Sequence, residues 1–299
     1  MTNNLTPDSA CRTFFSNDIH FASFSNAILF DGKQVIHPER LVRYENDTSF
    51  IINDTKSVED EKRRRDIVVK TDVNGIYCLF GIEHQSSIDQ EMVIRCGNYE
   101  MVEYLKQLKN KKLKRLVPQV MIVFYTGDKK WNAPVKLSDY LDVPKELKAY
   151  VNEWRFIFID VKEIDTSKIK DAQTRYFIEA IQNMYKGNYD KLHRRIKMNR
   201  NNFICAAIIT GSIDLIKDLP EGDEIDMCEG MERMAEGFRS EGKLEEKRST
   251  LKEQLIIKLG AVSSRLEEQL TNASLEKLNV LTRNIFDITN EEDVLRIIN

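Results

Sequence analysis

The sequence is poor in the residues that build disulfide frameworks and zinc clusters. It has 5 cysteines and 4 histidines among 299 residues, and no two cysteines form a Cys-x-x-Cys pair. An odd number of scattered cysteines predicts free thiols, and the scattered histidines offer no zinc-ligand spacing. We therefore expect neither a disulfide scaffold nor a zinc site, and we expect the reducing environment of the cytoplasm.

Long apolar runs and an excess of positive charge are also missing. No apolar stretch approaches the roughly 20 residues that a transmembrane helix needs, and the opening Met-Thr-Asn-Asn-Leu-Thr-Pro-Asp lacks the basic and apolar regions of a signal peptide. The net charge is −3, which excludes a strongly basic nucleic-acid binder. We expect no membrane partner, and any contact with DNA must come from local patches.

No cysteine or serine occurs in a sequence setting typical of a nucleophile. Neither a Cys-His arrangement nor a Gly-x-Ser-x-Gly motif is present. The sequence therefore gives no support to a hydrolase with a covalent Cys or Ser intermediate. With 41% hydrophobic and 31% charged residues, the chain can still bury a full core.

The most informative stretch that is present predicts a β-hairpin. Apolar, β-branched and aromatic residues at 67–69 and 76–82 flank Asn74-Gly75, the dipeptide most typical of a two-residue type I′ turn, in which both central residues have positive φ. If these two residues form the turn, Val73 pairs with Ile76 and the numbers of opposing residues sum to 149. Asp66 then lies directly across from Glu83.

This register places several polar side chains on one face of the hairpin. Opposing residues share a face and side chains alternate along a strand, so Gln85 joins Asp66 and Glu83, while Ile82 and His84 point to the other face. Facing carboxylates repel each other unless a cation neutralises them, and a hard cation such as Mg²⁺ prefers oxygen ligands. The alternative is an ordinary charged pair on the solvent face of a hairpin.

A family resemblance is found at these same residues. It is carried by Arg65-Asp66-Ile67-Val68-Val69-Lys70, by Gly81-Ile82-Glu83-His84-Gln85-Ser86-Ser87-Ile88-Asp89, and by Met92, Arg95 and Tyr99 after them. Together they resemble the recombination-promoting nuclease and transposase family of the Rpn type, which belongs to the PD-(D/E)XK nuclease superfamily. The segments 8–15 and 125–134 resemble the opening helix and a loop of the same family.

The resemblance implies a fold and an activity. The fold would be α/β, with a restriction-endonuclease-like mixed sheet flanked by helices and followed by an all-helical C-terminal region. The activity would be a Mg²⁺-dependent endonuclease, with Mn²⁺ as a substitute, that hydrolyses phosphodiester bonds in DNA and promotes recombination or is linked to mobile elements. The alternative is a catalytically weak DNA-binding or assembly module on the same scaffold.

The resemblance also implies roles for individual residues. Asp66 and Glu83 would bind the metal, and the backbone carbonyl of His84 would complete the protein ligands. Gln85 takes the place of the lysine that is usual in the superfamily. A carboxamide can orient water, but it supplies no positive charge and is not a useful general base. The side chain of His84, on the opposite face, is expected to be packed against helices.

Each of the other candidate residues near the expected metal site has two possible roles. Asp8 is either an auxiliary acid or an ordinary first-turn residue that favours the helix dipole, and Arg95 is either an auxiliary residue or a surface cation. The basic residues Arg63, Arg64 and Arg65, and later Lys111 and Lys112, either contact DNA phosphates or belong to a solvated run and a helix end.

The rest of the chain predicts further elements and a domain order. Strands are expected at 117–125 and 155–161, and mainly helices from about residue 167. One helix is expected to begin with Thr6 as its N-cap and Pro7 as its first residue. Another is expected from Gln90 to about Asn110, with Asp89 as its cap and with an apolar stripe formed by Met92, Cys96, Tyr99, Val102 and Leu105. We expect a nuclease-like domain at 1–190, a helical connector at 191–245 and a small helical domain at 246–299. The helical C-terminal half is a candidate surface for a homodimer.

Overall fold

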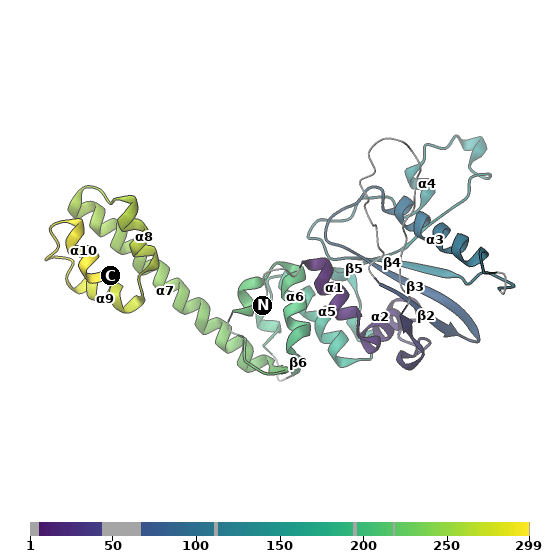
Figure 1. Ribbon diagram of the computed structural model, residues 1–299, viewed down its shortest axis with the longest axis horizontal. Helices are drawn as coiled ribbons and strands as arrows, with labels where there is room; N and C mark the ends of the chain where they lie inside the picture. Colours follow the sequence, from purple (N-terminus) through teal and green to yellow (C-terminus); the bar gives the residue numbers. More distant parts are fainter. Residues whose placement is uncertain (1–5, 44–66, 111–112, 194–195, 218, 299) are drawn as a thin grey trace. The chain divides into compact units, whose positions relative to one another are not determined.

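The structure, a computed structural model, describes residues 6–43, 67–110, 113–193, 196–217 and 219–298, without the side chains of residues 233–241. It divides into two compact units, residues 1–229 and residues 230–299 (Figure 1). The helices of the first unit are α1 (Pro7–Phe15), α2 (Asp18–Phe30), α3 (Met92–Leu108), α4 (Leu137–Tyr140), α5 (Ala172–Tyr185) and α6 (Arg200–Thr210).

A five-stranded mixed sheet forms the centre of the first unit. Its strand order is β1-β2-β3-β4-β5, in which β1, β2 and β3 are antiparallel while β3, β4 and β5 are parallel. The strands are β1 (Val42–Arg43), β2 (Ile67–Val73), β3 (Ile76–Gln85), β4 (Gln119–Tyr125) and β5 (Ile157–Asp160). The predicted mixed α/β architecture is confirmed.

The predicted hairpin between β2 and β3 is confirmed together with its register. Pairing runs from Val73↔Ile76 to Ile67↔Ile82, so the numbers of opposing residues sum to 149 as expected. Asn74 and Gly75 have φ angles of 51° and 81°, which are the positive values that a type I′ turn requires. Asp66, the residue before Ile67, lies outside the described residues.

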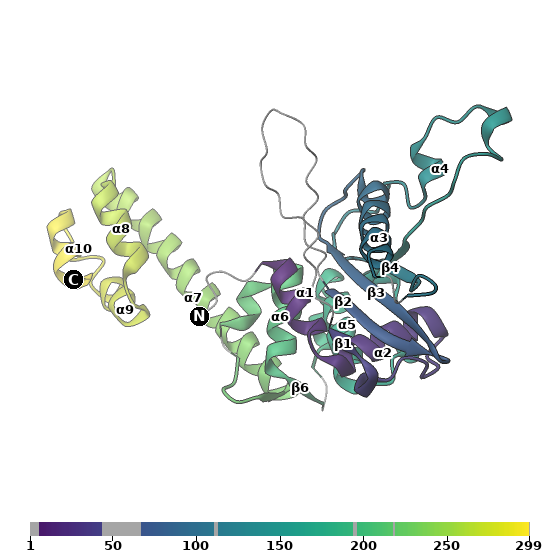
Figure 2. The same cartoon turned by 45° about the vertical axis from the view of Figure 1, so that its right-hand side comes forward.

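Helices cover both faces of the sheet. On one face, Cys96 and Tyr99 of α3 pack against Met121 and Val123 of β4. On the other face, Phe124 contacts the rings of residues from α1 and α2, with centroid distances of 5.6 Å to Phe15 and 5.3 Å to Phe24. Figure 2 shows α3 on one side of the sheet and α1, α2 and α5 on the other. The alternation of side chains along β3 and β4 therefore decides which helix each residue meets.

Helix α3 differs from the sequence expectation in two details. It begins at Met92 rather than at Gln90, with Glu91 as its N-cap residue and without a side-chain cap; the carboxylate of Asp89 accepts a hydrogen bond from the backbone N–H of Glu91 (2.8 Å). Leu105, expected on the buried stripe, is 43% exposed, whereas Gln107 is buried. Leu105 follows Cys96 by nine residues, which is two and a half turns at 3.6 residues per turn, so it lies on the side of the helix opposite the buried face.

The region after α5 is mostly helical, and α6 packs against α1 and α5 within the first unit. A short antiparallel pair, β6 (Lys197–Asn199) with β7 (Glu224–Asp226), corrects the expectation that this region is purely helical. Three residues are too few for an alternating pattern to be recognised. Among the described residues, no helix has both the length and the apolar content needed to cross a membrane.

The second unit is a small helical bundle with its own core. Its helices are α7 (Met227–Leu259), which begins in the first unit, α8 (Ser264–Asn272), α9 (Leu275–Arg283) and α10 (Glu291–Ile298). Apolar side chains from all four helices form one buried cluster, including Leu255, Leu266, Leu278 and Val294. Ser263 and Ser274 cap α8 and α9 with their side chains.

Candidate functional site

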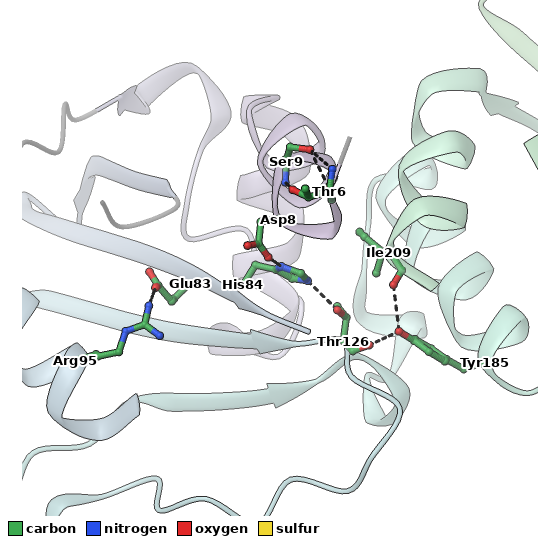
Figure 3. Close-up of polar contacts among 9 residues, drawn as sticks. All are labelled: Thr6, Asp8, Ser9, Glu83, His84, Arg95, Thr126, Tyr185 and Ile209. Atoms are coloured by element: carbon green, nitrogen blue, oxygen red, sulfur yellow. Dashed lines mark hydrogen bonds and ion pairs between the residues drawn. The ribbon is translucent and has the colours of Figure 1, made fainter. Parts of the chain in front are cut away.

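The carboxylate of Glu83 lies near the end of β3 and is bound by Arg95 from α3. The side chain of Glu83 is 3% exposed, and its Oε1 atom accepts a hydrogen bond from Nη2 of Arg95 at 2.7 Å. Nη1 of Arg95 donates to Oδ2 of Asp89 at 2.5 Å. Arg95 therefore bridges two carboxylates, one on the sheet and one in the loop that leads into α3 (Figure 3 shows its contact with Glu83).

The negative charge of Glu83 affects the groups around it. Burial alone would lower the pKa of Arg95, but hydrogen bonds to Tyr99 and Asp89 and the charge of Glu83 outweigh it and raise this pKa. Burial raises the pKa of Tyr99 and of Cys96, and the charge of Glu83 raises both further. Arg95 thus remains a cation and both neighbours remain neutral, so the local charge comes from the carboxylates and Arg95.

His84 lies on the opposite face, as the alternation predicted. Its side chain is fully buried, its Nδ1 atom is 2.6 Å from Oδ1 of Asp8, and its Nε2 atom is 2.7 Å from Oγ1 of Thr126. The hydrogen bond to His84 lowers the pKa of Asp8, with further contributions from the charges of His84, Arg12 and Arg95. Figure 3 shows how His84 connects α1 to the end of β4.

Asp8 therefore contacts His84 rather than Glu83. Thr6 is the N-cap of α1 and Pro7 its first residue, as predicted, so Asp8 is in the first turn of the helix. Its carboxylate is 53% exposed. It accepts a hydrogen bond from the imidazole of His84, which is distant in the sequence. This contact with a side chain of β3 was not expected from the sequence.

Gln85 lies at the end of β3 on the same face as Glu83, two residues further along the strand. It is half-buried, and its backbone carbonyl accepts a hydrogen bond from the N–H of Thr126 (2.8 Å). The remaining candidates cannot be placed beside it. Asp66 and the basic residues Arg63, Arg64, Arg65, Lys111 and Lys112 lie outside the described residues.

The donors at this strand end are oxygen atoms. In the described part of the chain, no three His, Cys, Asp or Glu side chains come close enough together to hold a metal ion. Glu83 offers a carboxylate, Gln85 a carboxamide oxygen and His84 a backbone carbonyl, all of them hard donors that suit Mg²⁺. Glu83, Asp89 and Arg95 together carry a formal charge of −1, so an added divalent cation would meet net negative charge. The residues present fit a hard cation.

The hydrogen bonds of His84 continue through Thr126 to Tyr185, and neither of these two residues was predicted from the sequence to be functional. Thr126 follows β4, the parallel neighbour of β3, and residues at the carboxyl ends of adjacent parallel strands meet at one edge of the sheet. That rule could have placed Thr126 near His84. Tyr185 gave no comparable signal, because α5 is remote in sequence. Its hydroxyl donates its one proton to the carbonyl oxygen of Thr126 and also lies 3.3 Å from that of Ile209.

The comparisons with known proteins give one positive result. Neither the curated proteins nor the solved structures contain a match to this chain. A family model described as "Putative transposase, YhgA-like" matches residues 38–199, which is more than half of the 299 residues. The matched segment includes the hairpin, Arg95 and Thr126, and it confirms the transposase-like resemblance found at these residues. The chain belongs to the YhgA-like transposase family.

Proposed function

We propose that the protein is a metal-dependent endonuclease that hydrolyses phosphodiester bonds in DNA, with its catalytic centre at the end of β3. The observation that carries this proposal is the nearly buried carboxylate of Glu83, held by Arg95 at 2.7 Å on the face that also carries Gln85. Keeping a charged group out of water is costly, so its position suggests a functional requirement. The antiparallel hairpin, the parallel strand after it and the helices on both faces support a PD-(D/E)XK-like fold.

Each residue has a proposed role. Asp66 and Glu83, with the backbone carbonyl of His84, would bind Mg²⁺, or Mn²⁺ in its place. When bound, such a metal polarises the phosphoryl oxygen and lowers the pKa of a water molecule. Gln85 orients the attacking water by hydrogen bonding but brings no charge. Arg95 brings the positive charge that a lysine at position 85 would supply, and it fixes the orientation of the Glu83 carboxylate.

The wider context is proposed from the family. A transposase-like family suggests a role linked to mobile elements, and we propose DNA recombination as its setting and the cytoplasm as its location. The DNA phosphates would be contacted by Arg63, Arg64 and Arg65 and by Lys111 and Lys112, because arginine and lysine neutralise phosphate charge and donate hydrogen bonds to its oxygens. Asp8 would act through His84, by fixing the backbone at the end of β3.

Plasmid cleavage tests the activity. Supercoiled plasmid is incubated with the wild type, with Glu83→Gln and with Glu146→Gln, each with Mg²⁺, Mn²⁺ or EDTA. Glu146 is an exposed acid of the same unit, so its variant controls for a change of charge away from the site. We expect chelator-sensitive cutting by the wild type and the control, and at least about a 100-fold loss in Glu83→Gln, since one ligand of the metal loses its charge.

A second function has one observation in its favour. Arg95 already neutralises Glu83, so the same scaffold could bind DNA or assemble with partners while cutting weakly or not at all. The same plasmid experiment separates the two functions. A folded wild type that shifts the plasmid on a gel and leaves it intact with every metal would favour the binding module and contradict the nuclease.

A further inference from the structure

The outer face of α3 is apolar, although it faces solvent. From residue 91 to residue 108, the exposed positions are Glu91, Ile94, Asn98, Met101, Leu105 and Leu108. The four apolar side chains among them are 40%, 42%, 43% and 65% exposed, in the order of the sequence. We call these six residues the α3 stripe. A surface helix normally presents charged or polar residues on this side, so the composition of the stripe needs an explanation.

The packing of α3 within its own unit does not provide this explanation. The opposite face of the helix is buried against the sheet through Met92, Cys96 and Tyr99, so the stripe is a second apolar face of the same helix. Its members follow one another at intervals of three, four, three, four and three residues. This alternation is the spacing at which two helices pack along a seam. A single polar Asn in such a seam is a known means of fixing its register.

Charge at the two ends of the stripe indicates the orientation of a partner helix. The exposed carboxylate of Glu91 is at the N-terminal end, and the exposed ammonium of Lys109 is at the C-terminal end. An antiparallel copy of the same helix would bring each Glu91 to the Lys109 end of its partner. A parallel copy would bring like charges together at both ends. A two-fold axis near Met101 would also place Ile94 opposite Leu108 of the other copy.

We propose that the α3 stripe is a homodimer interface, in which the α3 helices of two copies of this chain pack antiparallel across a two-fold axis near Met101. An isologous interface needs a surface that is complementary to itself. The stripe meets this need because its apolar side chains would face those of the other copy, and each Glu91 would lie near the partner's Lys109 end. The 17 residues of α3 span about 26 Å. One pair of helices of this length buries less surface than the roughly 1,600 Å² of a standard interface. We therefore expect a dissociation constant in the micromolar range.

The oligomeric state of the full chain tests the interface. Sedimentation velocity from about 1 to 100 µM is measured for the wild type, Met101→Glu and Ile257→Lys. Ile257 is an 85% exposed apolar residue of α7, so its variant controls for a dimer through the C-terminal helices. We expect the wild type and Ile257→Lys to dimerise alike, and Met101→Glu to dimerise at least about 10-fold more weakly.

Three results would overturn the proposal. One is a wild type that remains monomeric at the highest concentration, another is a dimer that Met101→Glu leaves intact, and the third is a dimer that Ile257→Lys disrupts instead. Circular dichroism of each variant verifies that it is folded. Leu108→Lys provides a second disruptive variant, because this side chain is 65% exposed and its replacement leaves the core of the unit unchanged.

Cysteine cross-linking tests the orientation. Chains with Ile94→Cys and chains with Leu108→Cys are oxidised with copper phenanthroline, separately and as a mixture. The antiparallel arrangement predicts a covalent dimer mainly in the mixture, whereas a parallel arrangement would cross-link Ile94→Cys chains to one another. The charge pair gives an independent check: Glu91→Lys and Lys109→Glu should each weaken the dimer, and the double variant should restore it. This inference does not depend on the proposed nuclease activity.

Discussion

The guanidinium of Arg95 lies 2.7 Å from the carboxylate of Glu83 and ties helix α3 to the end of strand β3. The two side chains are 25% and 3% exposed, so the pair is largely shielded from water. Such a pair stabilises a structure little compared with a well-packed apolar pair, but removing one partner is expensive. Its presence at this strand end therefore favours a role in positioning Glu83.

We expect Arg95→Met to lower the free energy of unfolding by about 2–4 kcal/mol, since it removes the guanidinium from a nearly buried carboxylate. In the double variant with Glu83→Gln, the loss should be smaller than the sum of the two single losses by about 1–3 kcal/mol. Urea unfolding of the four proteins gives the coupling. Losses that add within about 0.5 kcal/mol would show that the pair is not coupled.

His84 should matter for stability through both ring nitrogens. Replacement by leucine keeps the volume but removes the hydrogen bonds to Asp8 and Thr126, and Thr126 is fully buried. We expect a loss of about 1–3 kcal/mol in the free energy of unfolding. Thr126→Val should cost less in the His84→Leu background than in the wild type, because its hydroxyl has already lost this partner; an equal cost would contradict the network.

The buried phenol of Tyr185 should make the free energy of unfolding fall at high pH. Burial, followed by the charge of Asp128, raises the pKa of its phenol from 10.0 to about 12. Because the folded state holds the proton more tightly than the unfolded state, this contribution is complete below pH 10 and is lost as the pH rises towards 12. Tyr185→Phe should be about 1 kcal/mol less stable at neutral pH and should lose less between pH 10 and 12. Identical alkaline profiles would contradict this assignment.

The turn of the hairpin predicts a pure backbone effect. Gly75 has a φ of 81°, and a Cβ atom there would meet nothing within 4 Å. Gly75→Ala should therefore cost about 1 kcal/mol or more through the left-handed conformation alone. Asn74→Gly, at a φ of 51°, should change the stability by only a few tenths of a kcal/mol. Thermal unfolding of both variants checks this, and equal costs would argue against a type I′ turn.

The hairpin shows what local sequence can predict. Asn74-Gly75 fixes the turn, the turn fixes the register, and the register assigns Glu83 and His84 to opposite faces. All of these steps involve neighbouring residues, and the structure agrees with them from Val73↔Ile76 to Ile67↔Ile82. The same reasoning correctly found the N-cap of α1 at Thr6.

Contacts between distant segments do not follow from local sequence patterns. Asp8 meets His84 across 76 positions of sequence, and Tyr185 meets Thr126 across 59. Only the packing of α1 and α5 on the sheet creates these pairs. The exposure of Leu105 has a related cause: local sequence predicts that an apolar residue on a helix faces the core, whereas α3 has two apolar faces.

Binding of Mn²⁺ shows whether Glu83 is a metal ligand without requiring turnover. The measurement is electron paramagnetic resonance of free Mn²⁺ titrated with the wild type, Glu83→Gln and Glu146→Gln. We expect one Mn²⁺ site per chain in the wild type and in Glu146→Gln, from which Mg²⁺ displaces the Mn²⁺, and binding at least about 10-fold weaker in Glu83→Gln. Equal Mn²⁺ binding by all three proteins, or none by the folded wild type, would contradict this expectation.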